Sequence, residues 1–99
     1  MRKFEISLST RAKLNLNSLL VYLEGKWSKK VQENFILKLD EAINQVSIYP
    51  YSSKESEELK GVYKKVITKQ TSFYYRISGN EIEIITIRDN RKNPMTIKL

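Results

Sequence analysis

Cysteine and histidine are both missing from this 99-residue sequence, and each absence removes a class of chemistry. Without cysteine there can be neither a disulfide nor a thiolate nucleophile. Without histidine, the commonest metal ligand and the usual general base are missing as well. A metal site would have to be built from carboxylates alone, so we expect neither a metal nor a cofactor.

Glycine and proline are scarce, with three and two residues respectively. Hydrophobic residues make up 40% of the chain and charged residues 29%, a composition that favours a folded chain over a disordered one. A chain of this length supplies one hydrophobic core. We therefore expect a single domain over residues 1–99.

Long apolar runs and recognisable catalytic motifs are also absent. The basic N-terminus is not followed by an apolar stretch of signal-peptide length, and no segment is apolar for long enough to span a bilayer. We expect a cytoplasmic protein without a membrane partner. No phosphate-binding glycine-rich loop, zinc spacing or nucleophile–base constellation occurs, which excludes most enzyme classes.

Negative charge is the minority sign. Eighteen lysines and arginines against eleven aspartates and glutamates give a formal net charge of +7. Such an excess favours polyanionic partners such as RNA, DNA or an acidic protein. The alternative is a charged surface that only keeps the protein soluble.

The first half of the sequence predicts a strand followed by two helices. Residues 2–8 alternate between apolar and polar side chains, as in a half-buried strand. Apolar residues then recur every three or four positions over residues 10–26, and again from residue 29 to residue 48, which predicts two amphipathic helices. Two consecutive helices with a short junction form an antiparallel hairpin.

The ends of the two helices carry recognisable signals. Ser9 or Thr10 can cap the first helix and Ser28 the second, because a serine or threonine hydroxyl accepts a hydrogen bond from a first-turn amide. Pro50 disfavours helix at the residue before it, so the second helix should end there. Trp27, at the junction and in step with the apolar stripe, is expected to plug the core.

The second half of the sequence predicts three strands, rich in β-branched and aromatic residues, over residues 62–68, 73–77 and 82–87. Between the last two strands, residues 78–81 contain Gly79-Asn80, which suits a tight hairpin turn. Residues 51–60 are polar and aperiodic, so they read as an exposed connection.

The expected fold is therefore α+β, in the order strand, helix, helix, strand, strand, strand. We expect an antiparallel sheet backed on one face by the helical hairpin, with the place of the first strand left open. A function must then lie on the surface that the helices leave uncovered.

Basic and aromatic side chains are interleaved along the last three strands, and residues 60–80 contain no aspartate or glutamate. Aromatic rings can stack on bases while cations hold phosphates. Ordinary sheet packing explains Phe73 and Tyr75, whereas Tyr63 and Tyr74 are better surface candidates; for the lysines, solvated charge is the alternative. The candidate residues for binding a target or nucleic acid are Lys64, Lys65, Lys69, Tyr74, Arg76, Arg88, Arg91 and Lys92.

Five segments form an ordered pattern over nearly the whole chain: RAKLNLNSLLVYLEGKWS (11–28), FILKLDEAINQVSIYP (35–50), GVYKKVI (61–67), FYYRI (73–77) and IITIRDNRKNP (84–94). In this order they resemble the RelE/ParE toxin superfamily of bacterial type II toxin–antitoxin systems. The resemblance implies the RelE-like fold, an antiparallel sheet backed by a helical hairpin. It also implies a toxin that inhibits growth, takes part in plasmid stabilisation and is neutralised by a cognate antitoxin.

The superfamily divides by activity, and the resemblance favours one side. RelE-like members cleave mRNA on the ribosome with lysine, arginine and tyrosine or histidine side chains, whereas ParE-like members poison DNA gyrase. Alignment to the RelE-like pattern places Lys65 on one lysine position, but Tyr63 on the other and Ser72 where an arginine is expected. The segment after Arg91 contains no tyrosine or histidine that could act as the acid.

We therefore expect a ParE-like, non-enzymatic gyrase poison, in keeping with the spacing of Arg88, Arg91 and Pro94. The alternative is a ribosome-dependent mRNA endonuclease that acts on ribosome and message, with Lys65 and Arg91 as its catalytic residues. A plain RNA-binding domain is a third possibility, disfavoured because the motifs of the common RNA-binding modules are missing.

Overall fold

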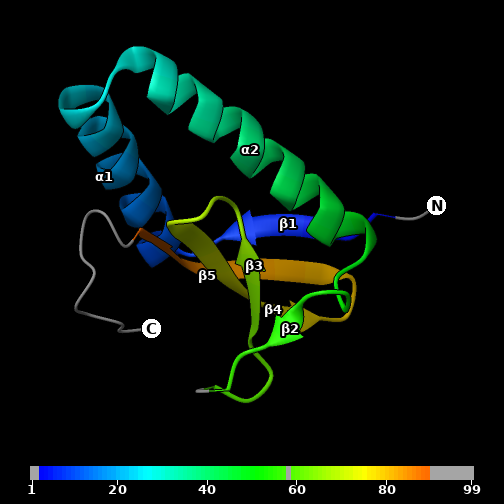
Figure 1. The fold of residues 1–99 in the computed structure, drawn as a ribbon. Coiled ribbons are helices and arrows are strands. Elements are labelled where there is room, and N and C mark those ends of the chain that lie inside the picture. Colours follow the sequence, from blue (N-terminus) through cyan, green and yellow to red (C-terminus); the bar gives the residue numbers. More distant parts are fainter. Residues whose placement is uncertain (1–2, 58, 90–99) are drawn as a thin grey trace.

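A computed structural model describes residues 3–57 and 59–89 of the chain, and the two helices lie on the same side of the sheet (Figure 1). The helices are α1 (Thr10–Lys26) and α2 (Lys29–Ile48). The strands are β1 (Glu5–Leu8), β2 (Lys54–Glu55), β3 (Tyr63–Val66), β4 (Thr71–Ser78) and β5 (Glu81–Asp89). The expected order of one strand, two helices and three strands is confirmed, with the two-residue β2 added between α2 and β3, and the fold is α+β.

The sheet has the strand order β1-β5-β4-β3-β2 and is mixed. Strands β2 to β5 pair antiparallel, as expected. The expected antiparallel arrangement does not extend to the first strand, whose place was left open: β1 pairs parallel with β5. The helical hairpin between β1 and the later strands supplies the long connection that a parallel pair requires. The short strand β2 lies in the segment expected to be an irregular loop, where Lys54 and Glu55 add to the edge of β3.

Serine caps fix both helix starts. The Ser9 hydroxyl accepts a hydrogen bond from the Ala12 amide at 3.0 Å, and the Ser28 hydroxyl accepts one from the Val31 amide at 3.1 Å. Each cap satisfies an amide that has no partner within its helix. Of the two candidates for the first cap, Ser9 caps α1 and Thr10 is its first residue, while the expected cap Ser28 is confirmed; the helices end at Lys26 and Ile48.

The core lies between the helical hairpin and the face of the sheet that the hairpin covers. Its fully buried sheet residues are Phe73 and Tyr75 of β4 and Ile82 and Ile84 of β5. The helices contribute Ala12, Leu19, Leu23, Phe35, Leu39, Ala42 and Val46. The apolar stripes of the sequence therefore mark the buried faces correctly, with one exception. Trp27 was expected to plug the core, but it is 56% exposed.

A β-bulge joins α1 to the sheet. Tyr74 pairs with Thr86 but Tyr75 pairs with Ile84, so Ile85 is an extra residue in β5 without a partner in β4. The carbonyl of Ile85 accepts a hydrogen bond from the Ser9 hydroxyl at 2.6 Å. The residue that caps α1 therefore also binds the irregular point of β5, which fixes where the helix starts relative to the sheet.

The hairpin turn between β4 and β5 forms where the sequence placed it. Gly79 has a φ of +59°, a conformation that glycine adopts without a steric penalty. Asn80 does not share this conformation, because no described residue other than a glycine has a positive φ. A single glycine thus makes the turn.

Candidate functional site

The face of the sheet that the helices leave uncovered carries four of the candidate residues. The strand register aligns Lys64 of β3 with Tyr74 of β4, and Ser72 of β4 with Arg88 of β5. Side chains of directly opposite residues share a face, and they alternate along each strand. Lys64, Tyr74, Arg76 and Arg88 therefore lie on the face opposite Phe73 and Tyr75. We call this surface the open face.

Lys65 and Tyr63 lie on the other face of β3. Lys65 is aligned with the core residue Phe73 and is half-buried, and Tyr63 is aligned with Tyr75. The rings of Tyr63 and Tyr75 stack at a centroid distance of 5.6 Å, and Tyr51 meets Tyr63 edge-on at 5.9 Å. Tyr63 was expected to be a surface residue, but it is half-buried in this aromatic stack. The two adjacent lysines, Lys64 and Lys65, thus lie on opposite faces of the sheet.

Tyr74 is also buried, contrary to expectation. It is only 5% exposed even though it lies on the open face. It lines a shallow hollow of about 380 Å³, together with Lys54, Glu55, Ser56, Glu57, Lys64 and Val66. The edge strand β2 closes one side of this hollow. The polar segment 51–60 was expected to be an irregular connection, so the sequence did not predict this strand or the burial of Tyr74 beside it. The pairing of β2 with β3 depends on the tertiary structure and has no local signal in the sequence.

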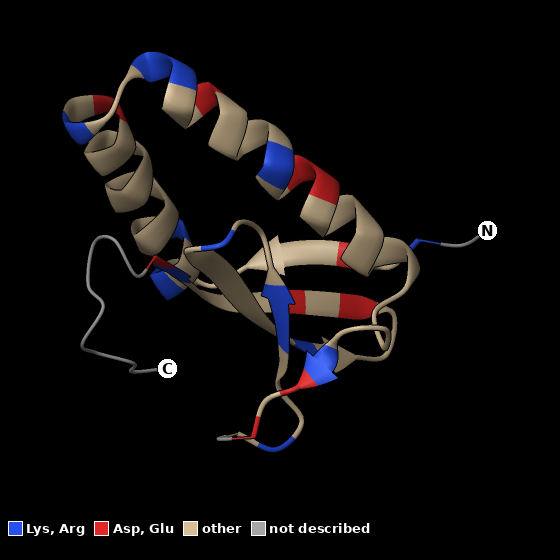
Figure 2. Ribbon diagram, viewed as in Figure 1, with Lys and Arg blue, Asp and Glu red and all other residues tan. Residues whose placement is uncertain are grey.

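The charge of the open face is partly compensated within the chain. The guanidinium of Arg76 lies 3.6 Å from the Glu83 carboxylate of β5, and Lys54 lies 3.4 Å from Glu57. Lys54 is aligned directly with Lys64, an arrangement of like charges that disfavours the strand pair unless anions lie nearby. Figure 2 shows acidic residues among the basic ones on these strands. The absence of acids from residues 60–80 therefore overstates the positive charge of this surface.

Of the remaining candidates, Lys65 and Lys69 lie in the described part of the chain. Lys69 is exposed in the turn between β3 and β4. Arg91 and Lys92 lie outside the described residues. The structure thus brings together Lys64, Tyr74, Arg76 and Arg88 but does not join Lys65 or Lys69 to them.

Tyr75 anchors the sheet to the end of α2. Its side chain is fully buried, and its hydroxyl donates a hydrogen bond to the Pro50 carbonyl at 2.6 Å. Burial raises the pKa of this hydroxyl above the usual tyrosine value. The Ser53 side chain lowers the pKa by a smaller amount, and Tyr63 raises it further. The hydroxyl is accordingly a structural donor rather than a source of protons at neutral pH.

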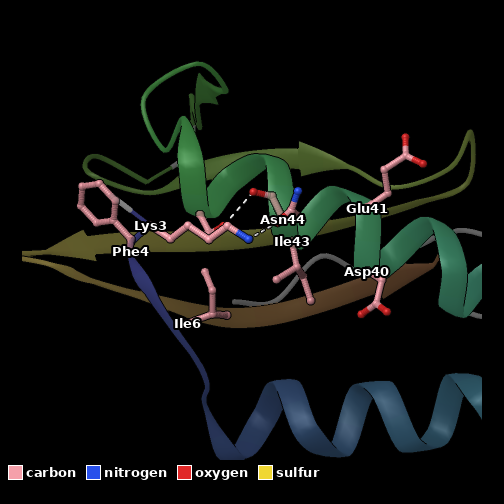
Figure 3. A pocket seen from close by; sticks show the side chains of 8 residues that line it. Lys3, Phe4, Ile6, Asp40, Glu41, Ile43 and Asn44 are labelled. Carbon is pink, nitrogen blue, oxygen red and sulfur yellow. Dashed lines mark hydrogen bonds between the residues drawn. The ribbon is translucent and has the colours of Figure 1, made fainter. Parts of the chain in front are cut away.

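A second surface is a groove of about 590 Å³ between β1 and α2, shown in Figure 3. Its apolar lining comes from Phe4, Ile6 and Ile43. Lys3 lies at one part of the rim, where its ammonium donates a hydrogen bond to the Asn44 side chain at 2.9 Å. The carboxylates of Asp40 and Glu41 are exposed on α2.

The groove lies beside β1, the edge strand of the sheet, whose outer side is tied to α2 at one point: the Phe4 amide donates a hydrogen bond to the Ser47 carbonyl at 2.8 Å. The amides of Glu5 and Ser9 donate to Asn80 and Ile84 on the β5 side. Main-chain groups alternate in direction along a strand, so those of Ile6 point away from β5. The part of this edge that follows Phe4 lies next to an apolar groove, which is the arrangement in which an extended peptide can add as a strand.

Two kinds of site are not found in the described part of the chain. No three aspartates or glutamates cluster closely enough to hold a metal ion in residues 3–57 and 59–89. In the same part of the chain, neither helix has the length and apolar composition needed to cross a membrane.

The architecture and sequence match known toxins. The family model described as ParE toxin of type II toxin–antitoxin system, parDE, matches residues 6–94. Toxin ParE1 of Caulobacter vibrioides is 26% identical over 86 residues, which cover 87% of this chain and 88% of that protein.

Solved structures of toxins share the fold. The chromosomal ParDE system of P. aeruginosa matches with a TM-score of 0.74 at 15% identity, covering 88% of this chain and 96% of that one. A mutant of the E. coli toxin RelE in the free state matches with a TM-score of 0.60 at 14% identity, covering 93% of this chain and 88% of that one. Both branches of the superfamily thus have this architecture.

Proposed function

Because the chain belongs to the ParE toxin family of type II toxin–antitoxin systems, we propose that it inhibits growth by poisoning DNA gyrase and that a cognate antitoxin neutralises it. The family membership and the resemblance of residues 84–94 to ParE-like toxins support gyrase as the target. The fold does not distinguish between targets, since RelE has the same architecture.

The observation that carries the proposal is the composition of the open face around Ser72. Cleavage of RNA without a metal requires a group that activates the ribose hydroxyl and cations that stabilise the charge developing on the phosphate. Ser72 has Val66 on one side and Arg88 on the other in the strand register. An uncharged serine and an exposed valine therefore occupy two of the three positions in this row.

The lysine proposed for the alternative activity is also badly placed. A ribosome-dependent mRNA endonuclease would use Lys65 and Arg91, but Lys65 shares the helix-covered face with Phe73. Lys64, Arg76 and Arg88 share the open face with Ser72. Loss of one transition-state charge stabiliser typically costs about 100- to 1,000-fold in rate, so a site short of two such groups should be nearly inactive as a nuclease.

Two surfaces of the described chain suit an antitoxin. The groove beside β1 offers an apolar floor and, beyond Phe4, a short length of strand edge for an extended segment (Figure 3). The outer surface of the helical hairpin exposes Leu14, Val21 and Leu37, each about two-thirds accessible. Apolar side chains exposed in this way are typical of surfaces that a partner covers. We propose that the antitoxin occupies the groove and offers carboxylates to the open face.

The proposed target is tested with purified protein and with growing cells. Gyrase poisoning predicts trapped, cleaved plasmid when the protein is added to gyrase, together with filamentation and a DNA-damage response while protein synthesis initially continues. Nuclease action predicts that amino-acid incorporation stops within minutes, with cuts in message at the ribosomal A site. Such cuts, abolished by Arg91→Ala but with gyrase supercoiling unaffected at excess protein, would overturn the proposal.

A further inference from the structure

The tip of the helical hairpin is a short, well-defined turn. Only Trp27 and Ser28 separate α1 from α2. Their two amides both donate to the Leu23 carbonyl at 3.0 Å, and the Ser28 hydroxyl caps α2 at the Val31 amide. The side chain of Gln32 donates to the Leu20 carbonyl at 2.9 Å, which ties the two helices together close to the turn. These contacts hold the tip in one conformation.

Trp27 lies at this tip and does not belong to the core. It is 56% exposed, and it is the only tryptophan of the sequence. The tip lies at the end of the hairpin away from the strands, so the sheet does not extend beneath it (Figure 1). Tryptophan is highly buried on average, and leaving so large an apolar ring in water forgoes the stabilisation that its burial would bring. The stability of the fold therefore gives no reason for a tryptophan to be exposed at this position.

Three exposed lysines surround Trp27 in the sequence: Lys26 at the end of α1, and Lys29 and Lys30 at the start of α2. The first turn of α2 contains no acidic residue. Cations at the N-terminus of a helix oppose the helix dipole, so Lys29 and Lys30 weaken α2 slightly instead of stabilising it. Glu24 of α1 and Glu33 of α2 lie within a helical turn of these lysines along the chain, and Figure 2 shows acidic positions beside the basic ones, so the positive charge of the tip is partly compensated.

The chemistry of this tip matches a nucleic acid better than a protein. Lysine is depleted from protein–protein interfaces, where arginine is enriched, but it binds phosphate well as a point charge. A flat indole ring among lysines combines base stacking with contacts to the phosphate backbone, as proteins that bind single strands do. An exposed ring can stack on a base only where that base is unpaired.

We propose that the hairpin tip binds a single-stranded stretch of DNA, with the Trp27 ring stacked on an unpaired base and Lys26, Lys29 and Lys30 contacting the flanking phosphates. The choice of DNA over RNA rests on the proposed function, since gyrase acts on DNA. The binding itself requires only this chain and an oligonucleotide. Its failure can therefore be distinguished from failure of gyrase poisoning, which is measured separately with the enzyme.

The only tryptophan provides a direct measurement. Titration of the purified full chain with a single-stranded DNA oligonucleotide should quench Trp27 fluorescence saturably, and three phosphate contacts should give a slope of log affinity against log salt of about −2. Poly-glutamate of equal charge should bind without this quenching, and duplex DNA should bind more weakly. No saturable quenching by DNA, equal quenching by poly-glutamate, or binding to single-stranded RNA but not to DNA of the same sequence would overturn the proposal.

Variants separate stacking from charge, with affinity measured by the anisotropy of a labelled oligonucleotide. Trp27→Ala should weaken binding about 5- to 150-fold, the range expected for one stacked base. Tyr51→Ala removes an exposed aromatic ring elsewhere and should leave affinity unchanged. Replacing the three tip lysines with glutamine should reduce the magnitude of the salt slope by about 2, whereas the same replacement of the exposed Lys13, Lys38 and Lys60 should not. Equal losses in the matched variants would assign binding to net charge and contradict the tip site.

Discussion

Asn15 of α1 accepts a hydrogen bond from the Thr86 hydroxyl of β5 at 2.7 Å and a second from the Ile87 amide at 3.2 Å. Both donors lie beyond the point where β1 stops pairing with β5, whose last aligned residue is Ile84. The asparagine side chain thus takes over the role of a neighbouring strand at this edge. It connects the first turns of α1 to the strand that leads toward Arg88.

Asn15→Ala should lower the free energy of unfolding by about 1–3 kcal/mol, because the buried Thr86 hydroxyl and the Ile87 amide would both lose their acceptor. Denaturation in urea measures the change. Asn17→Ala, an exposed substitution on the same helix, serves as the control and should change stability by less than about 0.5 kcal/mol. Equal effects of the two substitutions would show that the Asn15 contacts contribute nothing specific.

Leu19→Asp and Phe35→Asp should each unfold the protein. Both side chains are buried between the helices and the sheet, at 2% and 3% exposure. An unpaired charge buried there costs several kcal/mol against a total stability of about 5–15 kcal/mol. Far-UV circular dichroism and thermal melting decide the outcome. Leu14→Asp and Leu37→Asp, at exposed positions of the same helices, should keep the native spectrum; retention of the fold in all four variants would contradict the assigned helix faces.

Stability at alkaline pH should depend on Tyr75. Burial raises the pKa of its hydroxyl in the folded protein, so the folded state retains a proton that the unfolded state releases at lower pH. The contribution to stability is complete below the ordinary tyrosine pKa and is lost as pH rises through the folded value. The Tyr75→Phe variant has no hydroxyl that could titrate at this position. It also lacks the hydrogen bond to the Pro50 carbonyl.

The free energy of unfolding of the wild type should therefore fall relative to that of Tyr75→Phe between about pH 9 and pH 11, around the ordinary tyrosine pKa. If the hydrogen bond to Pro50 makes the wild type the more stable protein at neutral pH, the difference between the two narrows. Urea unfolding at several pH values measures it, and lysine titration affects both proteins alike. A difference that stays constant over this range would mean that the Tyr75 hydroxyl is not held neutral by the fold.

Antitoxin affinity should distinguish the two adjacent lysines of β3. Lys64 and Arg88 share the open face, whereas Lys65 shares the face of Phe73. If the antitoxin presents carboxylates to the open face, the double variant Lys64→Glu, Arg88→Glu should bind it more weakly and with a smaller dependence on salt. The double variant Lys65→Glu, Arg91→Glu should show a smaller loss of both. Calorimetric titration at several salt concentrations tests this. Affinity that is indifferent to salt and to both pairs of substitutions would assign recognition to the apolar groove.

Several features of the fold follow from local sequence because they depend on neighbours along the chain. The spacing of apolar residues gave both helices and their buried faces, including Leu19 and Phe35, and the serine caps gave their starts. The glycine of the β4–β5 turn was found in the same way. Each of these signals acts within a few residues, through helix periodicity, a capping hydrogen bond or backbone freedom.

The candidate site was harder to predict because its geometry depends on strand register. Alternation shows that Lys64 and Lys65 point in opposite directions, but only pairing with Ser72 and Phe73 shows which of them reaches the open face. The same limit applies to Arg76, whose partner Glu83 comes from another strand. Tyr74 was taken for a surface residue because the sequence carries no sign of the edge strand β2 beside it.

The sequence by itself determined that cysteine and histidine chemistry is absent. It also determined the type and order of the main helices and strands, and the family. Tertiary structure alone decided that β1 joins the sheet in parallel, that Tyr74 is buried and that Trp27 is exposed. Trp27 shows the reason most clearly. Its spacing from Leu23 continues the buried stripe of α1, but burial requires another element to lie against that stripe. At the tip of the hairpin the sheet has already ended, and no local pattern in a sequence records where a distant strand stops.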